Sequence, residues 1–169
     1  MPLPITTITA ARDYPAKEQL IFAHDLERYE MQRYRGLALS FLPIRPSISR
    51  LMAALGVECE QRLIALETLA ERLHLRDCLP GGRPTWPQLR FRLSQAQPLY
   101  RFITDEAMAC HTLAYALAAA HHSRQISELV AQSSRTAEVE TLVGHFIEQK
   151  RNECDLLEQA QDKAYNTMV

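Results

Sequence analysis

The amino-acid sequence predicts an all-α fold, an antiparallel bundle of four long helices with one long crossover between the second and third helices. Three observations favour this fold. Four stretches repeat apolar residues with the period of an α-helix. Proline and glycine gather in the gaps between these stretches. The first and last gaps are short, whereas the middle one is long. We expect the whole chain, residues 1–169, to form one domain.

The first helix is predicted from about Ala16 to Leu42, because Pro15 precedes this stretch and Pro43 follows it. Residues 1–15 then form an N-terminal arm. The residues expected to face inward are Leu20, Ala23, Glu27, Met31, Tyr34, Ala38 and Phe41.

The second helix is predicted to begin at Ser47, whose hydroxyl can accept a free backbone N–H, and to end near His74. Its inward face is predicted to hold Leu51, Leu55, Glu58, Ala65 and Leu69.

Residues 75–103 differ in composition and are predicted to form the crossover. The stretch 79–87 alone contains three prolines and two glycines. Arginines and aromatic residues alternate along the segment, which favours either a cover over the bundle or a docking site for an acidic partner. These residues are Arg83, Trp86, Arg90, Phe91, Arg92, Tyr100, Arg101 and Phe102.

The third helix is predicted from a cap at Thr104 or Asp105 to about Gln132, and the fourth helix from Thr136 onward. The inward residues of the third helix are predicted to be Ala114, Leu117, His121 and Glu128. Those of the fourth are predicted to be Leu142, Phe146, Gln149, Leu156 and Ala160.

The lengths of the connections determine the predicted topology. The short links 43–46 and 133–136 force two hairpins. Helices of this size are about 40 Å long, and the segment 75–103 is long enough to run back along the bundle. Two hairpins joined by one long crossover give the predicted bundle.

The composition limits the classes of function. Hydrophobic residues make up 47% and charged residues 23%, as in a globular protein, and the net charge of -1 gives no strong nucleic-acid signal. The N-terminus lacks the pattern of a secretory signal and no run is long enough to span a membrane, so we expect a cytoplasmic protein. The four cysteines form no CxxC pair and are expected to be reduced and buried. No nucleophile motif or phosphate-binding loop is present.

Two glutamates stand where the helical period requires apolar residues. Glu27 lies seven residues after Leu20 and seven before Tyr34, and Glu58 lies seven after Leu51 and seven before Ala65. Burying an ionised carboxylate costs several kcal/mol unless it is paired or bound to metal. These positions therefore indicate a polar site at the middle of the bundle.

The segment from Glu27 through Tyr34 to Ala38 resembles the first helix of the rubrerythrin branch of the ferritin-like superfamily. Glu58 with Gln61 is similar to the Glu-x-x-His pair of its second helix. The resemblance implies a ferritin-like fold with a di-iron site, built from a glutamate on each of two helices and Glu-x-x-His on the other two. Iron oxidation, peroxide reduction and oxygen activation are the activities it implies.

The remaining ligand positions depart from this pattern. Gln61 stands in place of histidine, and His121 stands in place of a bridging glutamate. The fourth helix offers Gln149 with Asn152 or, in a register shifted by one, Glu148 with Arg151. Arginines also lie near the same level: Arg62, Arg124 and Arg151. The sequence therefore predicts a degenerate di-iron site.

Three hypotheses follow. The first is a weak or mononuclear site of Glu27, Glu58 and His121 that holds Fe or Mn, with Gln61 and Gln149 at the other ligand positions. The second is a non-enzymatic helical interaction module without metal, in which Tyr34, Gln61, His121 or an arginine bonds the carboxylates. The third is an oxygen-using enzyme that acts on a small or tRNA-linked substrate. Enzymatic activity is left open, and we expect a homodimer.

Overall fold

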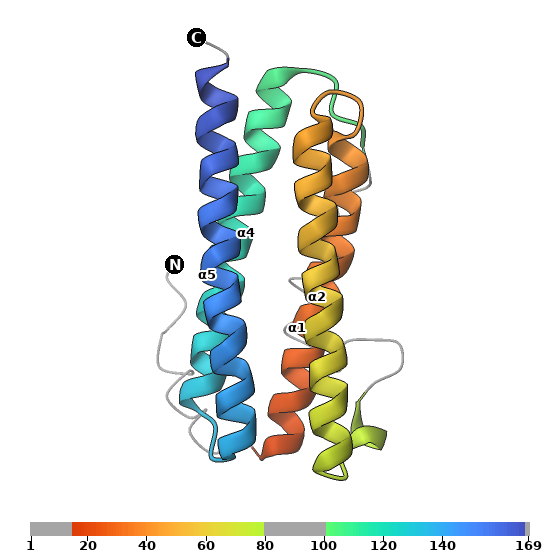
Figure 1. The fold of residues 1–169 in the computed structure, drawn as a ribbon, viewed down its shortest axis with the longest axis vertical. Helices are drawn as coiled ribbons and strands as arrows, with labels where there is room; N and C mark the ends of the chain where they lie inside the picture. Colours follow the sequence, from red (N-terminus) through yellow and green to blue (C-terminus); the bar gives the residue numbers. More distant parts are fainter. Residues whose placement is uncertain (1–14, 80–100, 168–169) are drawn as a thin grey trace, which may run out of the picture.

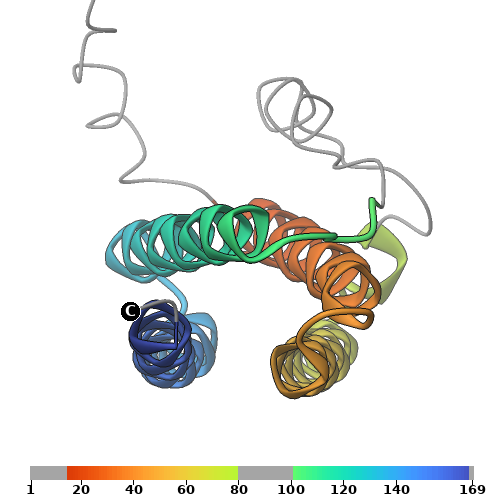
Figure 2. The same cartoon turned by 90° about the horizontal axis from the view of Figure 1, so that it is seen from above.

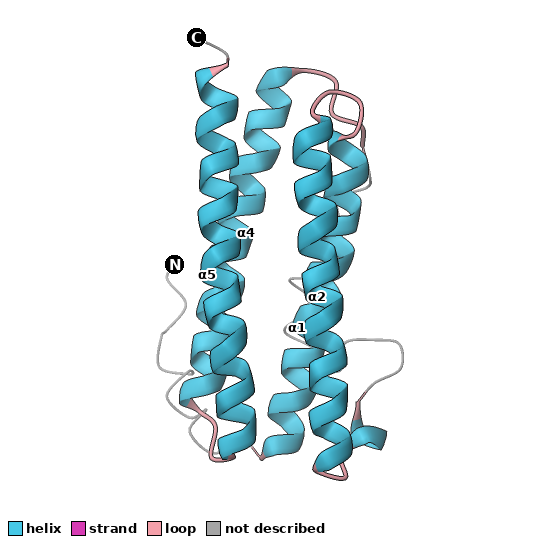
Figure 3. Ribbon diagram, in the orientation of Figure 1, coloured by secondary structure: helices cyan, strands magenta, loops and turns pink. Residues whose placement is uncertain are grey.

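The computed structural model describes residues 15–79 and 101–167. Over these ranges the chain forms the helices α1 (Ala16–Phe41), α2 (Pro46–Arg72), α4 (Glu106–Gln132) and α5 (Ala137–Asn166), and a single 3-10 turn, η3 (Arg76–Cys78) (Figure 1). The described ranges contain no strand, as the colouring of Figure 3 shows. The prediction of an all-α protein with four long helices is therefore confirmed for this part of the chain. Residues 1–14 of the predicted arm and residues 80–100 of the predicted crossover lie outside the described ranges.

The helix starts follow local backbone chemistry. The side chain of Asp105 accepts a hydrogen bond from the Met108 backbone N–H at 2.7 Å, so Asp105 is the N-cap of α4. The predicted cap at Ser47 is wrong, because α2 begins one residue earlier at Pro46. Proline suits the first turn of a helix, where its fixed φ is already helical and its missing N–H has no partner to lose.

The helices form two closely packed pairs, α1 with α2 and α4 with α5, and α4 also lies along α1 (Figure 2). Contacts far apart in sequence fix the ends. The Ile103 N–H donates to the Ser40 carbonyl at 2.9 Å, and Arg45 Nη2 lies 2.7 Å from Glu106 Oε2. At the opposite end, Gln19 Nε2 donates to Ser133 Oγ at 3.3 Å. The start of α4 therefore lies beside the end of α1, and its end lies beside the start of α1.

Each long helix buries a stripe of residues spaced alternately three and four apart, the period that keeps one helix face toward its neighbours. The stripe of α1 is Leu20, Ala23, Glu27, Glu30, Tyr34, Leu37 and Phe41. That of α2 is Ile48, Met52, Leu55, Cys59, Arg62, Leu66 and Leu69. That of α4 is Ala109, Leu113, Ala116, Ala120, Ser123, Ser127 and Val130. That of α5 is Val139, Val143, Phe146, Lys150, Glu153 and Leu157, and it continues past the partly buried Ala160 to Ala164.

The core consists of two apolar clusters with a polar layer between them. One cluster surrounds Phe41, Met52 and Leu113, toward the end of the bundle where α1 stops and α4 begins. The other surrounds Leu69 and Phe146 at the opposite end. In all four stripes the central positions carry polar or small residues. The polar layer is therefore a property of the whole bundle and not of one helix.

The sequence assigned the α1 register correctly at Glu27, but it placed the inward faces of α2, α4 and α5 wrongly. Glu58, His121 and Gln149 are not buried. The buried residues are their immediate neighbours in the sequence, Cys59, Ala120 and Lys150. The predicted stripes follow partly buried residues such as Leu51 and Leu142, which flank the core without forming its centre.

All four cysteines are free thiols. Three are buried as predicted, Cys59, Cys110 and Cys154, whereas Cys78 is partly exposed in η3. No helix in the described ranges combines the length and the apolar character that a membrane span requires.

Candidate functional site

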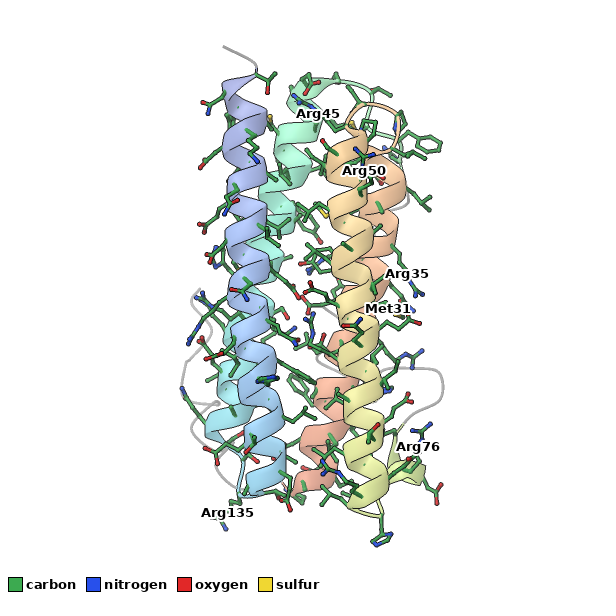
Figure 4. All side chains as sticks on the ribbon, viewed as in Figure 1. Met31, Arg35, Arg45, Arg50, Arg76 and Arg135 are labelled. Atoms are coloured by element: carbon green, nitrogen blue, oxygen red, sulfur yellow. The ribbon has the colours of Figure 1, made fainter. Side chains whose placement is uncertain are left out.

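Six charged side chains meet at the middle of the bundle. The carboxylates are Glu27, Glu30 and Glu153, and the cations are Arg33, Arg62 and Lys150; none of the six is more than 5% exposed. They project from α1, α2 and α5 into the space between the helices, where Figure 4 shows a dense group of nitrogen and oxygen atoms at mid-height. We call these six residues the central network.

Arg62 joins three helices through its guanidinium group. Its Nε donates to Glu27 Oε2 of α1 at 2.7 Å, and its Nη2 forms an ion pair with Glu153 Oε1 of α5 at 2.6 Å. The same Nη2 lies 3.2 Å from Cys59 Sγ, and Nη1 reaches Gln149 Oε1 at 3.4 Å. A planar guanidinium with several fixed donors suits such a role between separate carboxylates.

Lys150 of α5 contacts the other oxygen of Glu27. Its Nζ contacts Glu27 Oε1 at 2.7 Å, donates to Ser123 Oγ of α4 at 2.9 Å, and also donates to Glu30 Oε2. An ammonium group has three donors, and all three have a partner here. Glu27 is thus held between the guanidinium on one oxygen and the ammonium on the other.

Contacts of Arg33 and Tyr34, both on α1, complete the polar layer. The Tyr34 hydroxyl donates to Glu153 Oε2 at 3.2 Å, and Arg33 Nη2 donates to Glu30 Oε1 at 3.2 Å. The Arg33 guanidinium also lies 4.9 Å from the centre of the Tyr34 ring, within the range of a cation–π contact. Each oxygen of the three carboxylates therefore lies against a cation or a hydroxyl, although Glu153 Oε1 contacts Arg62 as an ion pair without hydrogen-bond geometry.

The charges of the central network balance, with three carboxylates facing three cations. Burial alone would raise the pKa of Glu30, but Lys150 and Arg33 outweigh it and lower this pKa to about 2. Burial would lower the pKa of Lys150, yet Glu27 and Glu30 raise it above its usual value. For Glu153, burial raises the pKa although Arg62 opposes the shift. At neutral pH the Glu30–Lys150 pair is therefore fully charged.

Of the predicted site residues, only Glu27 is part of the buried network. The Glu58 side chain is 46% exposed, with its Oε2 4.0 Å from Arg62 Nη1. His121 is 37% exposed and its Nε2 lies 3.2 Å from Glu158 Oε1. Gln61 and Gln149 are exposed, although Gln149 still reaches Arg62. The expected set of Glu27, Glu58 and His121 does not come together in the core, because α2 and α4 turn other residues inward.

The arginines expected near the site separate in the same way. Arg62 lies at its centre, whereas Arg124 and Arg151 pair with Glu128 outside the core, at 3.6 Å and 3.8 Å.

Sequence reasoning missed Glu30, Arg33, Lys150 and Glu153. A usable signal was present for α5, because Val139, Val143, Phe146 and Leu157 define a stripe that contains Lys150 and Glu153. The predicted registers placed Gln149 or Glu148 inward instead, one or two positions before Lys150, and so left both charged residues out of the site.

A metal ion does not fit the network as it stands. Ligand atoms of Glu27, Glu30 and Cys59 lie within 4.8 Å of one another. The oxygens of both glutamates are already held by Arg33, Arg62 and Lys150. Burial also raises the pKa of the Cys59 thiol, and the protonated thiol is a poor ligand. A divalent ion would have to displace an ammonium or guanidinium group whose charge is already neutralised.

Comparison with known proteins gives no family for this chain: no family model matches it, and neither does any curated protein or solved structure.

Proposed function

We propose that this chain is a ferritin-like helical module, related to the rubrerythrin branch, in which the central network takes the place of the metal site. One observation carries the proposal: Arg62 and Lys150 each contact two of the three buried carboxylates. In a di-iron protein the positive charge that neutralises such carboxylates comes from the metal ions. Here two side chains supply it.

The path of the chain supports the antiparallel ferritin-like arrangement. The links 42–45 and 133–136 are short, so each helix pair is a hairpin. The end of α2 and the start of α4 lie at opposite ends of the bundle in Figure 1. The two described ends of this connection therefore lie about one helix length, or about 40 Å, apart, as the ends of a ferritin-like crossover do.

The spacing of the inward polar residues supports the relation to a di-iron site. Such sites use two residues three apart on each of two helices. α2 turns Cys59 and Arg62 inward, and α5 turns Lys150 and Glu153 inward, with the same spacing. In our proposal these pairs correspond to the two Glu-x-x-His pairs, with cations at one position of each.

The role that this chemistry favours is that of a non-enzymatic interaction module. The buried carboxylates are neutralised by internal partners, so they are poor metal ligands and poor bases toward a substrate. What the network does provide is specificity, since the ion pairs of Arg62 and Lys150 within it join different helices and are satisfied in one register only. We propose that the network sets the alignment of the four helices, and that the outer surface carries the function.

Metal analysis of the full chain, purified from cells grown with added iron and manganese, tests the proposal. We expect much less than one metal ion per chain, with the same content in the Glu27→Gln variant. A content near one ion per chain that is lost in Glu27→Gln would overturn it.

A second experiment tests the relation to the ferritin-like site. The variant combining Cys59→Glu, Arg62→His, Lys150→Glu and Glu153→His restores the implied ligands on α2 and α5. We expect its melting temperature, followed by circular dichroism, to rise on addition of Fe(II) or Mn(II), while that of the parent does not. A folded variant whose melting temperature ignores both metals would count against the relation.

A further inference from the structure

The outward side of α2 is poor in charge along its middle. From Arg50 onward its exposed residues are Arg50, Ala53, Ala54, Val57, Glu60, Gln61, Ile64, Thr68, Glu71 and Arg72. Val57 is 51% exposed and Ile64 is 58% exposed, two turns apart on the same face. We call Arg50, Ala54, Val57, Gln61, Ile64, Thr68 and Glu71 the α2 outer stripe. Its spacing, alternately four and three, is that of a helix face that packs along another helix.

The outward side of α5 provides the contrast. Its exposed residues include six charged ones, Glu148, Arg151, Asp155, Glu158, Asp162 and Lys163, which outnumber the exposed apolar Leu156 and Tyr165. That is the ordinary pattern for a solvated helix face. Exposed apolar side chains that share one helix face with small residues, where the middle of that face carries little charge, favour an interaction site. The α2 outer stripe therefore has the character of an interface.

We propose that the α2 outer stripe docks on the same stripe of a second copy of this chain, with the two α2 helices antiparallel about a two-fold axis near Gln61. Arg50, Val57, Ile64 and Glu71 follow one another at intervals of seven. An antiparallel copy therefore places Val57 beside Ile64 of the second copy and Arg50 beside its Glu71. The same contacts occur twice, as a two-fold interface requires.

Charge at the two ends of the stripe selects the antiparallel direction. Counted together with its ion-pair partner, the start of α2 carries a net positive charge from Arg45, Arg50 and Glu106. The end of α2 carries a net negative charge: Glu67, Glu71 and Asp77 stand against Arg72 and Arg76, and Arg76 pairs with both glutamates. Figure 4 shows Arg50 and Arg76 at opposite ends of the helix. Antiparallel packing brings the positive end of one copy to the negative end of the other, and the helix dipoles favour the same direction.

The flank of the stripe fits the same symmetry. Arg35 Nη2 and Glu60 Oε2 form an exposed ion pair at 3.2 Å, with side chains 55% and 52% exposed. Glu60 lies beside the proposed two-fold axis, so the Arg35–Glu60 pair of one copy lies next to the same pair of the second copy. The two arginines and two glutamates can then be arranged with opposite charges as neighbours. Small side chains at Ala53 and Ala54 allow the helices a close approach. A single helix pair is smaller than a standard interface of about 1,600 Å², so we expect a dimer that dissociates in the micromolar range.

The test is sedimentation equilibrium of the full chain between about 1 and 100 μM, a range that includes the roughly micromolar dissociation constant expected of a small interface. We expect a monomer–dimer equilibrium whose dissociation constant rises at least about tenfold in Ile64→Glu, because a charge then enters the apolar contact. Leu129→Glu is the matched control: Leu129 is 45% exposed on α4, outside the stripe. This control should leave the dissociation constant unchanged.

Charge reversal tests the direction of packing. Arg50→Glu and Glu71→Arg should each weaken the dimer about tenfold, and the double variant should restore it to within about threefold. Glu71 also pairs with Arg76 at 3.3 Å, so the melting temperature of each variant is measured to confirm that the bundle is intact. A chain that stays monomeric at 100 μM would overturn the proposal. Dissociation by Leu129→Glu but not by Ile64→Glu, or a double variant without recovery, would overturn it equally.

Discussion

At the middle of the bundle, charged side chains lie in the interior and apolar side chains lie on the surface of α2, the reverse of the usual distribution. Inside, Arg62 and Lys150 lie with three carboxylates, each fully or almost fully buried. Outside, at the same level of α2, Val57 and Ile64 are more than half exposed. The comparison teaches that the polarity of a residue does not decide its side of a helix. Charges can be buried where each has a partner of opposite charge, and in our proposal the exposed apolar residues of α2 contact a second copy of the chain.

The largest expected effect is the loss of one cation from the interior. Lys150→Met keeps most of the side-chain volume but leaves Glu27 and Glu30 without their shared ammonium. We expect the free energy of unfolding in urea to fall by about 3–5 kcal/mol, because an uncompensated buried charge remains. Lys163→Met, on the exposed side of the same helix, should change it by less than about 0.5 kcal/mol.

Adding Glu30→Gln to Lys150→Met removes a carboxylate together with the ammonium. The double variant should be more stable than Lys150→Met alone, with a coupling energy of about 1–3 kcal/mol. Additive losses would mean that the contact between Glu30 and Lys150 contributes nothing.

Acid provides a second way to disturb the interior. The pKa of Glu30 is lowered from 4.5 to about 2 in the fold, so between these values the unfolded chain binds more protons than the folded one. The stabilisation from Glu30 is thus present above pH 4.5 and lost as the pH falls toward 2. The raised pKa of Glu153 acts in the opposite sense. Urea unfolding of Glu30→Gln should therefore show a weaker loss of stability than the parent over this interval; equal slopes would contradict the ion pair.

A smaller effect is expected at the edge of the network. Tyr34→Phe removes one buried hydrogen bond to Glu153 Oε2 and keeps the ring against Arg33. Removing a hydrogen bond to a charged group costs about 1.5–3 kcal/mol. Thermal unfolding followed by circular dichroism checks this, and an unchanged melting temperature would show that Glu153 finds another donor.

The smallest effect is expected outside. At protein concentrations below the dimer dissociation constant, Ile64→Gln should change the free energy of unfolding by less than about 0.5 kcal/mol, because more than half of this side chain already faces water. A loss near 2 kcal/mol in the monomer would show that Ile64 belongs to the core, and the contrast between the two sides would disappear.

The sequence was sufficient for the four helices and for a polar site at their middle, because period, proline and glycine are local signals. Glu27 and Tyr34 were placed correctly since both stand in a strongly apolar stripe. The other three registers failed for a physical reason. On α2 and α5 the central inward residues are Arg62, Lys150 and Glu153, which are favourable inside only in each other's presence. Their partners come from different helices, so no single stretch of sequence reveals the compensation.

Unfolding of the chain in urea, with EDTA or with added Fe(II) or Mn(II), tests most directly whether the protein's own cations replace metal. The account predicts the same free energy of unfolding in all three solutions, because Arg62 and Lys150 already neutralise the buried carboxylates. A metal that binds the folded state raises this free energy by about 2.7 kcal/mol at a hundred times its dissociation constant. A rise of that size in the parent chain, absent from Glu27→Gln, would contradict the account.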